Sequence, residues 1–415
     1  TSSILVWWIW MQTDLHADVA STRSGLRAEQ ILRSCVHCGF CNATCPTYLL
    51  TGDELDGPRG RIYLIKEMLE SGSANAVAQR HLDRCLTCRA CETTCPSGVE
   101  YGELLEFGRN FIEPQQPRPL VQSLMRRWLN AVVPDAEVFA RWVRVGHWFR
   151  WLLPGKLGAA LPKLAKRVPA SPQSHARKVL VLQGCVQRVA TPGANDAFIN
   201  LLNGHGFEAI FAEAEGCCGS LNLHLGAHEQ AIAQIRRNVD VLYDLLQGRE
   251  DVEAVVSTAS GCGVTYKDYV RLLEDEPEYA AKAAWLVRKV RDAAEFVAAA
   301  GLARHTAPDV PSGAWHSPSS LQHGQQITGV VERLLQGAGY RLVEVADSHL
   351  CCGSAGTYSL LQPDMADALR ERKLESLQAN APDVIATANV GCQTHMAATS
   401  RVAVRHWLEL LGGPR

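Results

Sequence analysis

The sequence predicts a multidomain α+β protein, in which a helical N-terminal domain precedes two copies of a parallel-sheet α/β module. A cysteine string that occurs twice before residue 100, with a helical pattern between the copies, indicates the first part. Apolar strands that alternate with helical stretches after residue 177 indicate the α/β modules. A Cys-Cys-Gly triplet at 217–219 recurs at 351–353, which indicates that the module is duplicated.

The length of 415 residues suffices for two to three domains. Composition and pattern divide the chain into five segments. They are an N-terminal extension (1–24), a helical cysteine-rich domain (25–112), a basic Trp-rich helical linker (113–176), a first cysteine-rich module (177–300) and a second one (301–415).

The N-terminal extension contains a short apolar run at residues 4–10 (ILVWWIW). A bilayer span needs about 20 apolar residues, so this run predicts no transmembrane segment, and no other stretch reaches that length. It also lacks the basic start and cleavage site of a signal peptide. The run is either an artefact of the start site or an interfacial anchor.

The charge is nearly balanced at −2, which gives no general attraction to nucleic acid. Fifteen cysteines without a secretory signal indicate a reducing compartment and metal binding. We therefore expect a cytoplasmic protein. It could also lie peripherally on the cytoplasmic face of the membrane.

The two cysteine strings have the pattern of bacterial ferredoxins that hold [4Fe–4S] cubes. Each consists of three cysteines at x-x spacing and a fourth, next to proline, after an x-x-x spacer. Thiolates are the soft ligands that iron–sulfur clusters select, and the fourth cysteine of each string ligates the other cluster. The predicted sets are Cys35, Cys38, Cys41 and Cys95 for one cube, and Cys85, Cys88, Cys91 and Cys45 for the other.

Structural zinc and disulfides are the two alternatives for these strings. Zinc is commonly held by two CxxC units, and four ligands suffice for it. It does not require three closely spaced cysteines followed by a fourth, twice along the chain. Disulfides need an oxidising compartment, which nothing in the sequence indicates. Residues 58–72 between the strings follow a helical pattern and end at a glycine, so a helix separates the two strings.

The linker is rich in Arg, Lys and Trp, and Asp135 and Glu137 are the only acids between residues 120 and 178. Such a segment favours a pair of helices that bridges two domains. Docking to a partner or to an anionic membrane surface are the other interpretations.

After residue 177 the order βαβαβ predicts a parallel sheet, with strands near 178–182, 208–212 and 254–258 and a longer helix near 227–247. Cysteines follow each strand, at the sheet edge where such folds place ligands. Four thiols meet there in the first module and predict a third cluster, with buried thiols or a redox disulfide as the rival interpretation. They are Cys185, Cys217, Cys218 and Cys262.

The second module offers one thiol fewer. Cys351 and Cys352 repeat the pair of the first module, and Cys392 repeats Cys262 at nearly the same offset along the chain. The two Cys-Cys-Gly triplets are 134 residues apart, and the residue 134 positions after Cys185 is Ser319, not a cysteine. A complete cluster is therefore less expected here. His395 is either an imidazole donor or a capping residue, and substrate or quinone binding between the modules stays open.

The chain resembles the iron–sulfur subunits of glycolate oxidase (glycolate dehydrogenase), whose relatives serve lactate utilisation, anaerobic glycerol-3-phosphate dehydrogenase and heterodisulfide reductase. The resemblance covers residues 25–412, while Ser319, Thr265 and His395 depart from the cysteines of some relatives. It rests on residues 35–48 (CVHCGFCNATCPTY), 57–61 (GPRGR), 349–358 (HLCCGSAGTY) and 388–395 (ANVGCQTH).

The resemblance implies a function as a non-flavin electron-transfer subunit. A partner flavoprotein with FAD would oxidise glycolate to glyoxylate, and this chain would pass single electrons towards the quinone pool. The sequence carries no GxGxxG motif, Walker loop or Ser/His/Asp set, so we expect no catalytic residue and no glycolate oxidation by the isolated chain. The alternative is an electron-transfer or reductase subunit of one of the related complexes.

Overall fold

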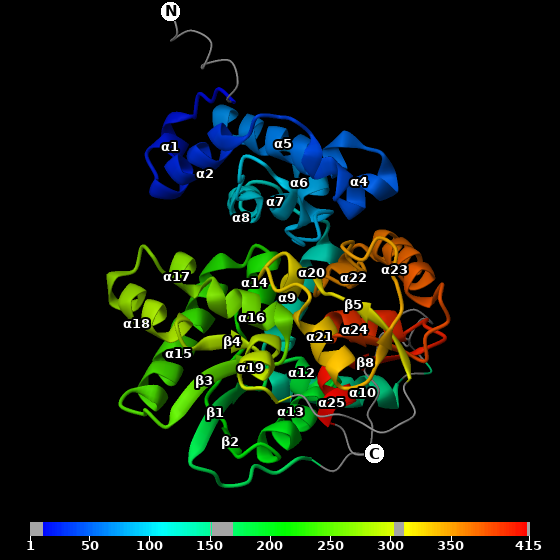
Figure 1. Ribbon diagram of the computed structural model, residues 1–415. Coiled ribbons are helices and arrows are strands. Elements are labelled where there is room, and N and C mark those ends of the chain that lie inside the picture. Colours follow the sequence, from blue (N-terminus) through cyan, green and yellow to red (C-terminus); the bar gives the residue numbers. More distant parts are fainter. Residues whose placement is uncertain (1–10, 150, 152–168, 303–310, 413–415) are drawn as a thin grey trace, which may run out of the picture.

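The computed structural model describes residues 11–149, 151, 169–302 and 311–412. A helical N-terminal domain lies over two α/β modules, which stand side by side beneath it (Figure 1). The α+β class and the parallel-sheet modules predicted from the sequence are confirmed. The apolar run at 4–10 lies outside the described residues.

The helical domain is built around α5 (Pro58–Ser71), which begins with a proline and ends before Gly72 in a left-handed conformation (φ 68°). The predicted helix between the cysteine strings is thus confirmed. Its other elements are α1 (Ala17–Ala20), α2 (Arg23–Ser34), α3 (Phe40–Ala43), α4 (Pro46–Thr51), the 3-10 helix η1 (Glu54–Asp56), α6 (Ala76–Asp83), α7 (Ala90–Thr94) and α8 (Tyr101–Ile112).

The core of this domain begins before residue 25. Met11 and Val19 are buried in the same apolar cluster as Leu32, Ile65 and Leu104. The described part of the expected extension is therefore packed into the helical domain, because its apolar side chains cover the outer side of that core.

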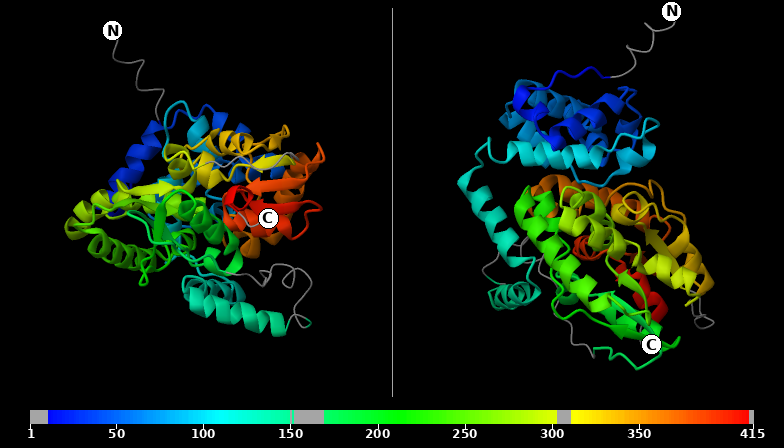
Figure 2. Two further views of the ribbon diagram at one scale, coloured as in Figure 1. Left: turned by 60° about the horizontal axis from the view of Figure 1, so that its bottom comes forward. Right: turned by 90° about the vertical axis from the view of Figure 1, so that its left-hand side faces the viewer.

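The linker forms α9 (Leu120–Val132) and α10 (Ala136–Trp148), which run along one side of the molecule (Figure 2). One face of α9 contacts both neighbours: Arg126 binds the Asp83 carboxylate at 3.0 Å and the Leu225 carbonyl at 3.3 Å. Trp128 of α9 and Trp142 of α10 are half exposed, and their rings lie edge to face at 5.6 Å between centroids. Helix α9 thus connects the helical domain with the first module, which agrees with the bridging interpretation of the linker.

The first module has a four-stranded parallel sheet with the order β2-β1-β3-β4. In this order the carboxyl ends of β1 and β3 flank the point where the chain reverses its direction of winding, which is where such sheets bind ligands. The elements are β1 (Arg177–Leu182), α12 (Gln187–Ala190), α13 (Gly193–Asn203), β2 (Phe207–Ile210), α14 (Ser220–His224), α15 (His228–Leu246), β3 (Val252–Ser257), α16 (Ser260–Lys267), α17 (Tyr269–Leu272), α18 (Pro277–Val287), β4 (Val290–Asp292) and α19 (Ala293–Ala299).

The second module repeats this plan with the order β6-β5-β7-β8. Its register matches as well, because Leu182 pairs with Ser257 in the first sheet and His316 pairs with Thr387 in the second. The elements are β5 (Ser312–His316), α20 (Ser319–Gln322), α21 (Val330–Gly337), β6 (Arg341–Leu342), α22 (Tyr358–Leu361), α23 (Pro363–Gln378), β7 (Val384–Thr387), α24 (Val390–Ala397), β8 (Ala403–His406) and α25 (Trp407–Gly412).

One apolar core joins the two modules. Val181 and Phe198 of the first module and Trp315 and Trp407 of the second belong to the same buried cluster. Trp407, at the start of α25, is fully buried in it. Burial on this scale makes independent opening of either sheet costly, since each would expose part of the shared core.

We therefore expect Trp407→Ala to destabilise both modules together, by about 3–5 kcal/mol, through loss of buried contacts and the cavity left behind. Anaerobic urea denaturation followed by circular dichroism measures this change. Trp142→Ala, which removes a half-exposed ring of α10, is the matched control and should cost far less. Two separate transitions, with only the second one moved by Trp407→Ala, would contradict a shared core.

Candidate functional site

The cysteines of the two strings lie in two groups, and each group takes its fourth member from the other string. Cys35, Cys38, Cys41 and Cys95 line one small cavity in the helical domain. Cys45, Cys85, Cys88 and Cys91 line another. Cys91 also borders the first cavity, so the two groups are neighbours.

Tight loops make these groups possible. His37 and Gly39 lie between the first cysteines in left-handed conformations (φ 53° and 82°), and Thr87 and Arg89 do the same in the second string (φ 54° and 57°). Each loop turns its three sulfurs inward over a short span. All fifteen cysteines are free thiols, so each group offers the four sulfurs that a [4Fe–4S] cube requires.

The two groups differ in their access to solvent. Cys38 of the first group is exposed, and Phe40 beside it is 60% exposed. Cys88 of the second group instead lines a cavity below the helical domain that the α/β modules also border. The first group thus faces the outside of the molecule, and the second faces the α/β modules.

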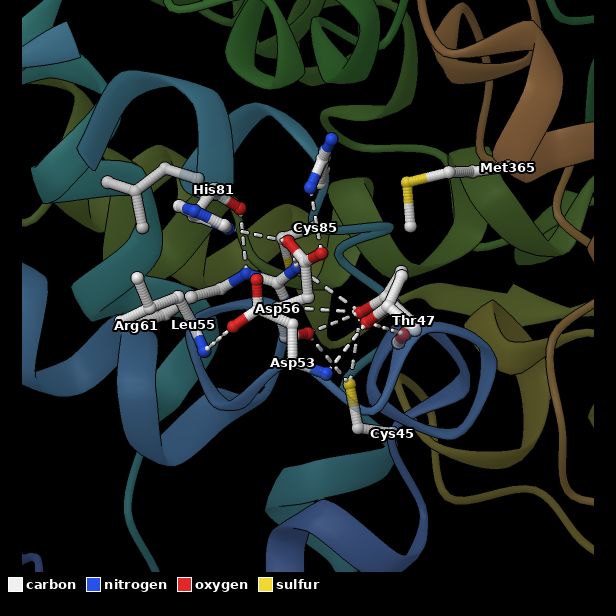
Figure 3. Close-up of polar contacts among 12 residues, drawn as sticks. Cys45, Thr47, Asp53, Leu55, Asp56, Arg61, His81, Cys85 and Met365 are labelled. Carbon is white, nitrogen blue, oxygen red and sulfur yellow. Dashed lines mark hydrogen bonds and ion pairs between the residues drawn. The ribbon is translucent and has the colours of Figure 1, made fainter. Parts of the chain in front are cut away.

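A buried charge network supports the second group (Figure 3). Arg61, 1% exposed, donates hydrogen bonds to the His81 carbonyl at 2.8 Å and to Thr47 Oγ1 at 3.2 Å. Thr47 Oγ1 lies 3.2 Å from Cys45 Sγ. Burial opposes the charge of Arg61, but negative neighbours, with Cys85 foremost, raise the pKa of the guanidinium above its usual value. Arg61 is thus a fixed positive charge beside two cysteines.

Asp56 completes this network and is fully buried. Its carboxylate accepts a hydrogen bond from Arg84 at 2.9 Å and lies 2.8 Å from His81 Nδ1. Asp53, Asp56 and His81 are close enough to hold a cation. Arg61 and Arg84 already balance Asp56, however, so its carboxylate is an anchor for the arginines.

Hydrogen bonds also reach the sulfur of Cys85. The buried Tyr101 hydroxyl donates to Cys85 Sγ at 3.6 Å, and the Thr87 backbone N–H donates to it at 3.5 Å. Such bonds stabilise negative charge on sulfur and are one of the means by which a protein sets a cluster's reduction potential.

The first module brings its four thiols together at the carboxyl edge of its sheet. Cys185 follows β1, the Cys217–Cys218 pair follows β2, and Cys262 lies in the first turn of α16 after β3. Hydrogen bonds link Cys185 to Cys217, Cys217 to Cys218, and Cys218 to Cys262. Bonds from the Cys185 and Cys218 thiols, together with the Gly219 backbone N–H, hold the pKa of Cys217 well below that of a free thiol.

Side chains from two helices fix the loop that carries the cysteine pair. Asn238 of α15 donates to the Cys217 carbonyl at 2.8 Å, and Tyr269 donates to the Cys218 carbonyl at 3.0 Å. Gly219 follows with φ 92°, and a Cβ atom there would come within 3.0 Å of Ile235. The glycine of the triplet is therefore required by both conformation and space.

The second module repeats this row with one change of donor. Cys351 hydrogen-bonds to Cys352, and Cys352 hydrogen-bonds to Cys392. Ser319 lies beside Cys351, and its buried Oγ has no hydrogen-bond partner among the described residues. Ser319 thus occupies the place that Cys185 has in the first module. His395 lies elsewhere: its Nε2 is 3.2 Å from the Ala366 carbonyl, which makes it a helix-packing residue. The imidazole that does reach the cysteines is that of His316, at the end of β5.

A cavity of about 220 Å³ separates the second cysteine group of the helical domain from the two modules. The row of the first module opens into it through all four thiols. Cys88, Cys351 and Cys392 border it from the other sides. Three cysteine sites therefore border one shared cavity.

The sequence did not single out Arg61, Tyr101, His316 or Lys373. Arg61 lies in the GPRGR string used for the resemblance, so its position was visible but its buried contact with the cysteines was not. For His316 the signal was the offset between the two Cys-Cys-Gly triplets, which places His316 opposite Leu182.

No helix among the described residues has the length and apolar character to cross a membrane. Residues 31–99 match the family model of the 4Fe-4S dicluster domain, and residues 179–267 and 315–397 match that of the cysteine-rich domain. Iron–sulfur binding is therefore supported by the family models as well as by the grouping of the cysteines.

Curated relatives span almost the whole chain. The glycolate oxidase iron-sulfur subunit of Escherichia coli (strain K12) is 45% identical over 97% of this chain and 98% of the relative. A probable glycolate oxidase iron-sulfur subunit of Bacillus subtilis (strain 168) is 30% identical over 88% of both chains. Lactate utilization protein A of the same organism is 24% identical over 56% of this chain and 98% of that one.

Among solved structures, a hypothetical protein from Helicobacter pylori has a similar fold. Its TM-score is 0.55 at 8% identity, and the match covers 96% of this chain and 74% of that one. This likeness concerns the fold alone. The near full-length sequence matches establish that the chain belongs to the family of glycolate oxidase iron–sulfur subunits.

Proposed function

We propose that this chain is the electron-transfer subunit of a glycolate dehydrogenase complex. A partner subunit with FAD would oxidise glycolate to glyoxylate, and this chain would carry the electrons towards the membrane quinone pool. Iron–sulfur clusters, when bound, supply one-electron redox chemistry. The observation that carries the proposal is the exchange of the fourth cysteine between the two strings, which makes two four-cysteine sites neighbours.

The residues of the helical domain would hold one cube at Cys35, Cys38, Cys41 and Cys95 and another at Cys45, Cys85, Cys88 and Cys91. The exposed Cys38 and Phe40 favour the first site as the contact point for a partner protein. Arg61 and Tyr101 would stabilise negative charge at the second site.

The four thiols of the first module would hold a third cluster. Their support is the continuous row of sulfur contacts from Cys185 to Cys262, together with their exposure to the same cavity as Cys88. This position would extend the electron path from the helical domain into the first module.

The described residues contribute no flavin motif, and the substrate would not touch this chain. Glycolate is therefore assigned from the names of the relatives, and lactate is the second candidate because a lactate utilization protein is also related.

The chain alone should not oxidise glycolate, because its cysteine sites offer no acceptor for a hydride. Anaerobically purified protein, with an artificial electron acceptor and glycolate, lactate or glycerol 3-phosphate, should give no turnover. Addition of the FAD-containing partner should give turnover with glycolate above the other two. Oxidation by the chain alone would contradict its role as an electron-transfer subunit. A preference of the complex for lactate would show that lactate, not glycolate, is the substrate.

The holoprotein should contain about twelve irons, four for each of three clusters. Cys217→Ser should lower this number to about eight, because it removes a central sulfur of the first module, while the EPR signals of the two cubes persist. Ser320→Ala, which changes the lining of the same cavity without removing a thiol, is the control and should keep all the iron. About eight irons in the unaltered protein would refute a third cluster.

Tyr101→Phe should make the reduction potential of the second cube more negative. The hydroxyl donates to Cys85 Sγ, and this bond stabilises the reduced, more negative cluster more than the oxidised one. We expect a change of tens of millivolts, since ~59 mV corresponds to a tenfold change in a one-electron equilibrium. Tyr63→Phe, on the exposed side of α5, is the control in the same EPR-monitored titration. An unchanged potential in Tyr101→Phe would contradict this role.

A further inference from the structure

The second module contains a compact group of three metal-binding side chains that the proposed electron path does not use. His316, Cys352 and Cys392 are all buried, and their ligand atoms lie within 4.8 Å of one another. Both ring nitrogens of His316 are buried and have no hydrogen-bond partner among the described residues. A buried imidazole without a partner is costly unless a ligand satisfies it.

We propose that the second module binds a single zinc ion through His316, Cys352, Cys392 and Cys351. Zinc in structural sites is tetrahedral and is commonly held by three cysteines and one histidine. Cys351 is the fourth donor because it is the immediate neighbour of Cys352 and lines the same cavity as Cys392.

The spacing of the donors favours one ion over a cluster. Zn–S bonds of about 2.3 Å place the ligand atoms of one tetrahedron roughly 3.8 Å apart. Among all described residues, only two groups of three donors fall within 4.8 Å of one another, and the other is the Asp53, Asp56 and His81 group. The cysteines of the helical domain and of the first module form no such compact triple, as expected if their sulfurs bind different irons.

Comparison of the two modules shows that one donor has been exchanged for another. Ser319 replaces the thiol of Cys185, and His316 replaces Leu182, which is an apolar core residue of the first module. Leu182 and His316 occupy the same place in their sheets, since each is the last residue of its strand and pairs with the equivalent partner strand. The second module therefore retains four donors, with nitrogen in place of one sulfur.

A buried cation balances the charge of this donor set. Lys373 of α23 is 3% exposed, and its ammonium donates to the carbonyls of Asp347 at 2.8 Å and Ser348 at 3.3 Å. Burial lowers the pKa of Lys373, and the negative charges of Cys352, Cys351 and Cys392 act against this by raising it. Three thiolates and Zn²⁺ carry a net charge of −1, which Lys373 neutralises. The apolar Val239 stands at the corresponding position of the first module, so this charge also belongs to the second module alone.

The test is elemental analysis and zinc X-ray absorption on the full-length holoprotein, purified anaerobically. The unaltered protein should contain about one zinc per chain, with three sulfurs at about 2.3 Å and one nitrogen at about 2.0–2.1 Å. His316→Leu, which installs the residue of the first module, should lower zinc at least tenfold and leave iron unchanged. His395→Gln is the matched control and should keep the zinc.

His316→Cys keeps the proposal testable if His316→Leu does not fold. This variant should retain zinc and change its shell from three sulfurs and one nitrogen to four sulfurs. A shell that stays unchanged in His316→Cys, a zinc content that survives His316→Leu, or a zinc-free protein with about four further irons lost on Cys352→Ser would each overturn the proposal.

Discussion

Buried sulfur charge is the constraint on which the rest of the structure depends. Cysteines bind metals as thiolates, and an anion away from water is stable only beside a compensating charge or several donors. Three of the four cysteine sites meet this need in different ways. Arg61 lies beside Cys45 and Cys85, backbone N–H groups surround Cys217, and Lys373 faces the cysteines of the second module. Arg61 is in turn held by Asp56, so the compensation extends through the helical domain.

The parallel sheets explain why a duplicated module can differ between its copies. The strand order brings three loops to one edge in both copies, whatever residues those loops carry. The shared geometry then permits a change of donor, because Leu182 and His316 project from equivalent strand ends. The shared core around Trp407 keeps the two edges together, and this fixes Cys262 and Cys392 on the walls of one cavity.

Local sequence signals predicted much of this architecture. The cysteine spacings, the helix that ends at Gly72 and the apolar strands are short-range features, and the structure places them as expected. The packing of Met11 into the helical core and the contact of His316 with Cys352 depend on chain segments far apart in sequence. His395 follows Cys392 by three residues and is therefore a candidate donor or a capping residue from the sequence, and in the structure its Nε2 lies 3.2 Å from the Ala366 carbonyl. Proximity along the chain draws attention to His395, whereas the offset between the two copies leads to His316, whose ring lies beside Cys352 and Cys392.

A zinc ion in the second module would give the two modules different tasks. Zinc has no redox chemistry in proteins, so the second module would hold its loops in place without accepting electrons. The electron path would then run from the exposed Cys38 site through the Cys88 site to the first module, and the second module would close the far wall of the cavity. The ion pair between Arg89 and Asp268 at 2.5 Å crosses directly from the second cysteine string to the first module. This partly buried ion pair lies on the proposed electron path, because Arg89 stands between Cys88 and Cys91 and Asp268 directly follows the helix that carries Cys262.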